Sequence, residues 1–231
     1  MAKQERALRT REALITSAAT VFDRDGFSTA SLSAISARAG VSAGALHFHF
    51  ASKAALAGAV EDAAARRLET LTRAHHGPAG NTLQRLVNAS HELARGLAGD
   101  VVLRAGFDLS GHRIRREGRD LRRQWQGWVE ETLERAAREG LLNTVTPEQV
   151  ASAVVAATTG FEVLGTQDPE WLAPRTITRF WQLLLPRLAA ADRLGGKLRL
   201  GEVGGIPVDV GAEAVFVQQP AVLDLARHAG L

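Results

Sequence analysis

The feature that most constrains this chain is the helical spacing of its apolar residues, which recurs from about residue 4 to residue 193. In the first such segment, Leu14, Ala18, Val21 and Phe22 follow one another at three- and four-residue intervals. No segment before residue 200 alternates apolar and polar residues as a half-buried strand would. The pattern therefore predicts an all-α fold.

Glycine, serine and proline residues divide this pattern into separate helices. Gly26 is expected to end the helix over residues 4–25, and Gly77-Pro78-Ala79-Gly80 marks a clear break. Thr146 followed by Pro147 is typical of a capped helix start. Beyond the break, the spacing predicts helices over residues 81–98, 101–115, 119–139, 147–165 and 174–193.

The excess of positive charge lies in the first quarter of the chain. Residues 1–53 hold seven Lys and Arg against four Asp and Glu, whereas residues 54–231 hold 21 of each. This asymmetry favours a polyanionic partner for the first quarter. A solvated basic arm is the alternative.

The composition also excludes several classes of protein. The chain has no cysteine, which rules out disulfides and thiolate metal sites. It has no signal-peptide core and no apolar run of about 18 residues that could span a membrane. We therefore expect a cytoplasmic protein with no metal, no cofactor and no membrane partner.

Residues 31–50 carry the pattern of a helix-turn-helix. Residues 31–39 and 42–50 predict two short helices, and Gly40 lets the chain turn tightly between them. The second helix begins with small residues that allow a close approach to bases in the major groove, namely Ser42, Ala43, Gly44 and Ala45. A small helical hairpin with no partner is the alternative.

The same segment also fits the G-x-S-x-G motif of serine hydrolases, as Gly40-Val41-Ser42-Ala43-Gly44. That motif requires a strand before the serine and a helix after it. A short helical pattern precedes the motif here. The sequence therefore disfavours a hydrolase, and we expect no enzymatic activity.

Several stretches of the sequence resemble the TetR family of repressors. Arg6-Ala7-Leu8-Arg9-Thr10-Arg11, Val21-Phe22-Asp23 and Gly26-Phe27 are similar to the opening of that family. Gly44-Ala45-Leu46-His47-Phe48-His49-Phe50-Ala51-Ser52-Lys53 resembles one branch of it, the γ-butyrolactone autoregulator receptors of antibiotic-producing actinomycetes. The resemblance is dense over residues 5–60 and thinner to about residue 190. It implies a homodimer that binds a palindromic operator in double-stranded DNA and leaves it when a small lactone-like inducer binds.

The motif and the resemblance together predict a set of DNA-contacting residues. Relatives usually carry Tyr at the position of His47 and Lys at the position of Ala43. His47 keeps a donor for a phosphate, whereas Ala43 has none, so we expect affinity or operator choice to differ from that of relatives. The predicted DNA-binding residues are Arg11, Ser31, Ser42, Ala43, Gly44, His47, Phe48 and Lys53.

Apolar stripes over residues 81–193 can line a ligand cavity. They include Leu86, Phe107, Trp125, Trp128, Val155 and Thr158, for which a plain packed core is the alternative. The resemblance assigns Trp128 to a pocket wall and Thr159 to a hydrogen bond with a ligand carbonyl. It also places Ala64 where some relatives use a Gln. The ligand class therefore stays open between a butyrolactone, a furan, a butenolide, an antibiotic and no ligand.

Two apolar helix faces are predicted to form the dimer. One holds Ile177, Phe180, Trp181, Leu184 and Leu188, and the other Val150, Val154, Thr158 and Phe161. Such faces from two subunits can build a four-helix interface, and burial within one chain is the alternative. The predicted domains are a helix-turn-helix DNA-binding domain over residues 1–53, a helical ligand-binding and dimerisation domain over 54–194, and a tail over 195–231 without an assigned role.

Overall fold

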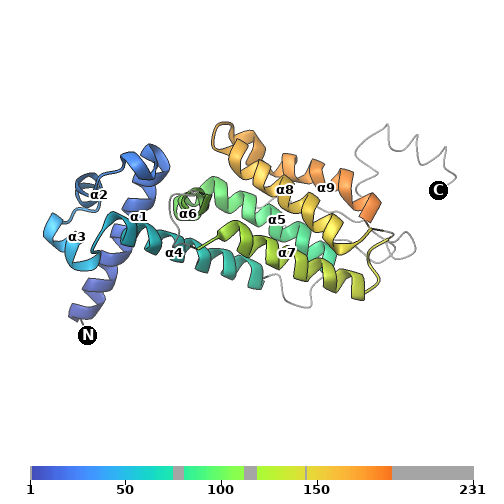
Figure 1. Ribbon diagram of the computed structural model, residues 1–231, viewed down its shortest axis with the longest axis horizontal. Helices are drawn as coiled ribbons and strands as arrows, with labels where there is room; N and C mark the ends of the chain where they lie inside the picture. The colour runs from blue at the N-terminus through green and yellow to red at the C-terminus, as the bar shows by residue number, and fades with distance from the viewer. Residues whose placement is uncertain (1, 75–80, 112–118, 144, 189–231) are drawn as a thin grey trace. The chain divides into compact units, whose positions relative to one another are not determined.

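The computed structural model describes residues 2–74, 81–111, 119–143 and 145–188, and its elements there are all helices (Figure 1). This confirms the predicted all-α class. The chain forms two compact units, one of residues 1–70 with 96–125 and one of residues 71–95 with 126–231. The predicted domain boundaries stay predictions, and the predicted tail over 195–231 lies outside the described residues.

The first unit is built around its N-terminal helix, which packs against α2 and α6. Its core holds apolar residues from successive elements, among them Phe22, Ile35, Leu46 and Leu56, each at most 1% exposed. The elements that contribute to this unit are α1 (Ala2–Thr29), α2 (Leu32–Arg38), α3 (Ala43–His49), α4 (Lys53–Ala74, through Thr70), the end of α5 (Thr82–Gly99, from Gly96), α6 (Val101–Gly111) and the first turn of α7 (Leu121–Arg138).

Gly26 interrupts α1 but does not end it. Its φ of 76° and ψ of 157° are not helical, and the chain then resumes a last turn to Thr29. Only glycine takes such a positive φ readily, because it has no Cβ. The predicted helix end is therefore a kink, after which the Phe27 ring lies with its centroid 5.6 Å from that of Phe22.

The second unit contains most of α5 (Thr82–Gly99), α7 from Gln126, α8 (Pro147–Gly165), the short 3₁₀ helix η1 (Pro169–Leu172) and α9 (Pro174–Leu188). Figure 1 shows α5, α7, α8 and α9 with their axes running along one direction. The predicted start of α8 is confirmed, since Thr146 accepts a hydrogen bond from Gln149 N and Pro147 follows it.

The apolar faces predicted for the dimer are largely buried within the single chain. Ile177, Trp181 and Leu188 of α9 are at most 2% exposed, and Val150 and Val154 of α8 are equally buried. The rings of Phe161 and Phe180 contact each other across α8 and α9 at 5.6 Å between centroids. The large apolar side chains that remain exposed in this unit are Val163, Leu164, Trp171 and Leu183. The buried members favour the alternative of burial within one chain, whereas Phe161, Phe180 and Leu184 of the predicted faces are half-buried. The residues of the dimer interface therefore stay a prediction.

Candidate nucleic-acid interface

Side-chain caps and a glycine turn stabilise the helix-turn-helix. Ser31 Oγ accepts from Ala34 N at 3.2 Å at the start of α2, and Ser42 Oγ accepts from Ala45 N at 3.1 Å at the start of α3. Between the two helices, Gly40 adopts a φ of 67°, as the predicted tight turn requires. The motif is therefore stabilised by two side-chain caps and one left-handed residue.

One face of α3 is anchored in the core and the other faces solvent. Leu46 and Phe50 are at most 5% exposed. Ala43, Gly44 and His47 are exposed, and Phe48 has 83% of its surface in contact with solvent. The exposed Phe48 ring is available for apolar contact with a thymine methyl group in the major groove. The exposed face of α3 is therefore the candidate base-reading surface.

Arg11 and Lys53 lie at the edges of this motif and interact with aromatic rings. The Arg11 guanidinium carbon lies 5.3 Å from the centroid of the Phe50 ring, at the end of α3. Lys53 Nζ donates to Ser28 O at 3.1 Å and to Ala30 O at 2.9 Å, and it lies 4.9 Å from the Phe27 centroid. An ammonium group has three donors, so one N–H of Lys53 is left for a phosphate. Lys53 thus ties the start of α4 to the end of α1, a structural role that its sequence position did not reveal.

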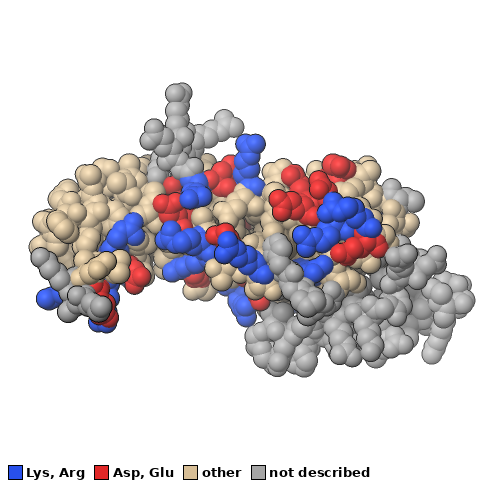
Figure 2. Space-filling view, turned by 90° about the horizontal axis from the view of Figure 1, so that it is seen from below, with Lys and Arg blue, Asp and Glu red and all other residues tan. Residues whose placement is uncertain are grey.

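Charges of both signs are mixed on one face of the molecule. Figure 2 shows Lys and Arg groups interspersed with Asp and Glu on the face that it draws. Many arginines are paired, as in Arg24 with Asp25 and Arg119 with Asp62. On this face, positive charges are therefore accompanied by negative ones and do not gather into one basic patch.

The residues predicted to bind a ligand are distributed over both units. Phe107 and Trp125 are buried in the first unit, and Leu86 and Trp128 in the second. On α8, Val155 and Thr159 are half-buried. The Thr158 hydroxyl donates within its own helix, to Val154 O at 2.9 Å and Val155 O at 3.2 Å. That these side chains line one cavity stays a prediction.

Sequence reasoning missed three buried polar groups in the second unit. Gln84 Oε1 and His91 Nε2 on α5 and Trp181 Nε1 on α9 have no hydrogen-bond partner in the described part of the chain. Burial lowers the pKa of His91 to about 4, so its imidazole is neutral at physiological pH. Buried polar atoms are normally satisfied, which makes these three atoms candidate anchors for a bound molecule. The sequence offered one signal for these groups, namely the position of His91 among the apolar residues of α5.

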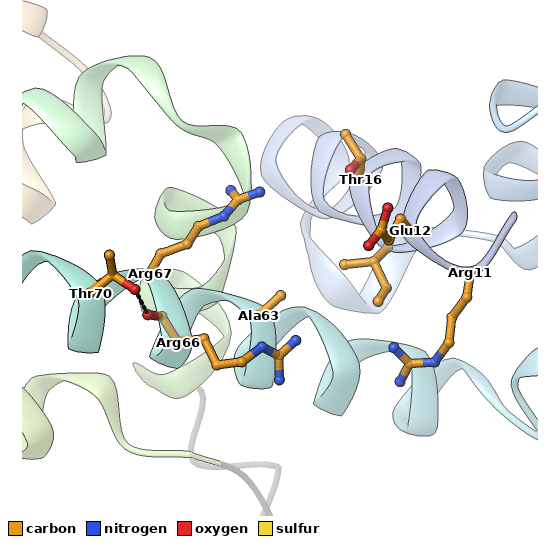
Figure 3. A pocket seen from close by; sticks show the side chains of 8 residues that line it. Arg11, Glu12, Thr16, Ala63, Arg66, Arg67 and Thr70 are labelled. Carbon is orange, nitrogen blue, oxygen red and sulfur yellow. Dashed lines mark hydrogen bonds between the residues drawn. The ribbon is translucent and has the colours of Figure 1, made fainter. Parts of the chain in front are cut away.

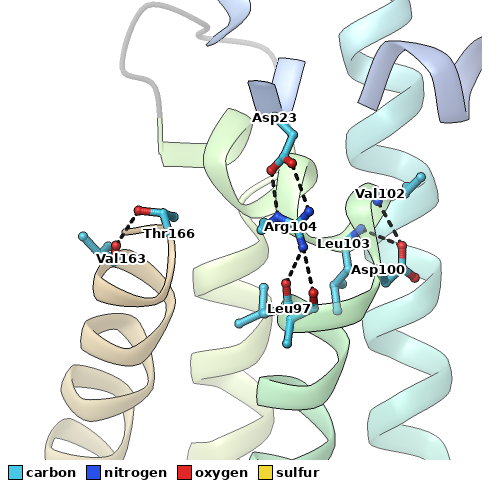
Figure 4. Close-up of polar contacts among 9 residues, drawn as sticks. Asp23, Leu97, Asp100, Val102, Leu103, Arg104, Val163 and Thr166 are labelled. Atoms are coloured by element: carbon cyan, nitrogen blue, oxygen red, sulfur yellow. Dashed lines mark hydrogen bonds and ion pairs between the residues drawn. The ribbon is translucent and has the colours of Figure 1, made fainter. Parts of the chain in front are cut away.

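A polar hub that the sequence also did not predict connects helices of the first unit (Figure 4). Arg104 of α6 forms a bidentate ion pair with Asp23 of α1, with Nε–Oδ1 and Nη2–Oδ2 distances of 2.8 and 2.9 Å. Its Nη1 donates to the carbonyls of Leu97 and Ala98 at the end of α5. Asp100 caps α6 by accepting from Val102 N at 2.9 Å. Arg104 therefore ties α6 to both α1 and the end of α5.

Backbone contact connects α6 to α4 as well. A Cβ at Gly106 would lie 2.2 Å from Ala64 Cβ, so glycine is what permits the two helices to meet there. Ala64 is fully buried in this contact. Ala64, the position at which some relatives carry a Gln, is thus buried in the contact between α4 and α6 in this chain.

The serine hydrolase alternative does not fit the structure. Ser42 caps α3 and is preceded by α2, so the required strand is missing from this described segment. Within the described ranges, no group of three His, Cys, Asp or Glu residues could hold a metal ion. No described helix is long and apolar enough to cross a membrane.

Comparison with known proteins identifies the family. The family model described as bacterial regulatory proteins of the TetR family matches residues 14–60, which contain the helix-turn-helix. The A-factor receptor protein of Streptomyces griseus is 33% identical over 194 residues, covering 82% of this chain and 67% of that protein. The chain therefore belongs to the TetR family of bacterial regulatory proteins, and it is a regulatory protein rather than an enzyme.

Solved structures confirm the predicted branch. A γ-butyrolactone receptor described as ArpA-like has a TM-score of 0.72 and 30% identity, covering 81% of this chain and 92% of its own. CprB from Streptomyces coelicolor, in complex with its biological operator sequence, has a TM-score of 0.69 and 30% identity over the same shares.

Proposed function

We propose that this chain is a transcriptional repressor that binds a palindromic DNA operator and leaves it when a small γ-butyrolactone-like molecule binds. The observation that carries the proposal is the exposed face of α3, which presents Ala43, Gly44, His47 and Phe48 to solvent. Leu46 and Phe50 hold this helix in the core from its other face. The relatives support it, since they are receptors of this class and one is in complex with its operator. Genes of antibiotic or secondary metabolism are the expected targets, and the cytoplasm is the expected location.

On DNA, α3 enters the major groove while residues around it hold the phosphates. Ser42 accepts a hydrogen bond from its own helix through oxygen, which leaves its hydroxyl hydrogen to donate to a phosphate. Ser31 Oγ also lies 3.1 Å from Ser33 Oγ, so this pair of hydroxyl groups shares its donors between each other and a phosphate. Arg11, His47 and the third N–H of Lys53 supply further donors. Because Ala43 offers none, this chain depends on His47 more than a relative with Lys and Tyr would.

A second copy of the chain completes the DNA-binding unit. A palindrome requires two α3 helices about 34 Å apart, one turn of DNA. Val163 and Leu164 of α8, Trp171 of η1 and Leu183 of α9 are 39–78% exposed, and a homodimer interface would remove them from water. Val163, Leu164 and Leu183 lie on the same two helices, α8 and α9, that the sequence predicts for the dimer.

The inducer is proposed to bind among helices of the second unit. Trp128 supplies an apolar wall. Trp181 Nε1 can donate to a lactone carbonyl, Gln84 Oε1 can accept from a hydroxyl group on the ligand, and the neutral His91 can do either, depending on its tautomer. The half-buried Thr159 hydroxyl makes no hydrogen bond among the described residues and is available for a ligand carbonyl.

Release of DNA is proposed to run through α6. The Arg104–Asp23 pair couples α6 to α1, and the Gly106–Ala64 contact couples α6 to α4. A ligand that favours a different position of α6 therefore changes the placement of the helices that carry α3. The shift occurs only if the ligand binds the released state more tightly than the DNA-bound state.

One observation favours a second candidate, a regulator of this family that answers a different ligand or none. Ala64 packs against Gly106, so a Gln at this position would have no room in the present packing. The test is release of operator DNA in a gel-shift assay, with purified γ-butyrolactones in one arm and extract of the producing culture in the other. Release by a butyrolactone supports the first candidate. Release by extract alone supports a different ligand, and no release in either arm contradicts the inducer half of the proposal.

A further inference from the structure

A cleft of about 540 Å³ lies between α1 and α4 in the first unit (Figure 3). Its volume falls within the range of roughly 300–1,000 Å³ that is typical of small-molecule sites. Arg11, Glu12 and Ile15 line it from α1, and Ala63, Arg66 and Arg67 line it from α4. None of the residues predicted to bind the inducer lines this cleft.

The lining of the cleft carries an excess of positive charge, because two guanidinium groups without an ion pair among the described residues, Arg11 and Arg66, face one carboxylate, Glu12. Figure 3 shows the guanidinium groups of Arg11 and Arg66 extending toward one another from the two helices. Neither forms an ion pair within the described ranges, whereas Arg67 is paired with Asp100. Two cations directed at one gap repel each other unless an anion lies between them. Planar guanidinium forks match the oxygen atoms of a phosphate especially well.

The rest of the lining narrows the chemistry of the ligand. Ile15 is buried and Ala63 half-buried, so they give the cleft an apolar side. The Glu12 carboxylate is exposed and accepts hydrogen bonds, for example from a hydroxyl group. We propose that this cleft binds a phosphorylated small molecule that carries hydroxyl groups, with Arg11 and Arg66 holding the phosphate.

A phosphate of operator DNA is a less suitable occupant than a free molecule. The α4 residues of the cleft, Ala63 to Thr70, lie ten to seventeen residues beyond Lys53, where α4 begins. At 1.5 Å per residue this is about 15–25 Å along the helix from the end that accompanies α3.

The cleft is nevertheless coupled to the DNA-binding motif through one residue. Arg11 lines the cleft and also lies over the ring of Phe50, the C-cap residue that follows α3. A phosphate that holds Arg11 withdraws it from the DNA side, so ligand and operator weaken each other's binding. This second input is separate from the inducer site, and binding to the cleft does not depend on the proposed function.

The test is isothermal titration of the full-length protein with pyrophosphate, without DNA and at constant ionic strength. The parent should bind it, and Arg66→Ala should bind it about tenfold more weakly, because one charge-assisted hydrogen-bonding group is lost. Arg123→Ala is the matched control, since Arg123 is exposed, makes no ion pair among the described residues and lies outside the cleft. Arg66 is itself exposed, so its truncation leaves the core intact.

Equal affinity for pyrophosphate in all three proteins, or no binding to the parent, would overturn the proposal. A second arm measures operator affinity. Pyrophosphate should weaken operator binding by the parent but not by Arg66→Ala. If Arg66→Ala instead weakens operator binding in the absence of pyrophosphate and reduces its salt dependence, the cleft holds a DNA phosphate and the small-molecule proposal is wrong.

Discussion

Replacing Gly106 with alanine tests the close packing of α6 on α4. Apolar carbon atoms pack at about 3.5–4.0 Å. The new Cβ would lie 2.2 Å from Ala64 Cβ and 3.5 Å from Leu121 Cδ2, so the two helices must separate by more than an ångström. Overpacking of this kind costs about 1–3 kcal/mol. Alanine in a helix returns about 0.5–1 kcal/mol relative to glycine. The cost of the steric clash exceeds the gain in helix propensity, so we expect Gly106→Ala to lower the free energy of unfolding by about 1–2 kcal/mol.

The assay is thermal and urea unfolding followed by circular dichroism at one fixed protein concentration. A loss of this size lowers the melting temperature by roughly 2–8 °C in a chain of this length. Gly127→Ala on α7 is the control, because a Cβ there meets nothing within 4 Å. That variant should gain about 0.5–1 kcal/mol from helix propensity alone. Adding Ala64→Gly to Gly106→Ala should recover part of the loss, since it removes the clashing atom. A Gly106→Ala protein as stable as the parent would refute this account of the α4–α6 contact.

Three further predictions follow from the remaining sites. His47→Ala should weaken operator binding about equally across sequences, and Ala43→Lys should strengthen it, because both changes act on phosphate contacts. Fluorescence anisotropy measures both affinities. If both variants bind with parental affinity, the proposed placement of α3 on DNA is wrong. Trp128→Ala should fold and bind operator but fail to release it on addition of inducer. Thr159→Val should weaken inducer binding more mildly, by about 0.5–1.5 kcal/mol, because one hydrogen bond is lost. An unfolded Trp128→Ala would instead show that Trp128 belongs to a plain packed core. The free energy of unfolding should fall as the pH drops from 6.5 toward 4, because the unfolded chain binds a proton on His91 at its ordinary pKa while the folded chain, with its pKa lowered to about 4, does not. The loss is up to about 3 kcal/mol. In urea titrations at several pH values, His91→Phe should flatten this dependence, and an unchanged slope would show that His91 is not its source.

The fold was predictable because it rests on local chemistry. The caps at Ser31, Ser42 and Thr146 and the left-handed turn at Gly40 each depend on a few adjacent residues, which a sequence displays directly. The apolar period likewise identified the helices, and the density of the match over residues 5–60 identified the family.

The parts that could not be predicted depend on residues far apart in the chain. Arg104 meets Asp23 across 81 positions, and Lys53 reaches back to carbonyls at the end of α1. Amphipathic periodicity shows that α9 has an apolar face, but it does not tell whether that face meets its own chain or another. For the same reason, Ala64 looked like a missing ligand contact until its packing against Gly106 was visible.

The central claim is tested most directly by selecting duplexes from a random DNA library with the full-length protein at low salt. The account predicts enrichment of a palindrome whose half-sites lie about 10 base pairs, or a multiple of that, apart from centre to centre. It also predicts an affinity for the selected duplex that falls steeply as salt concentration rises. No enriched sequence, together with no specific binding at low salt, would contradict the assignment of this chain as an operator-binding repressor.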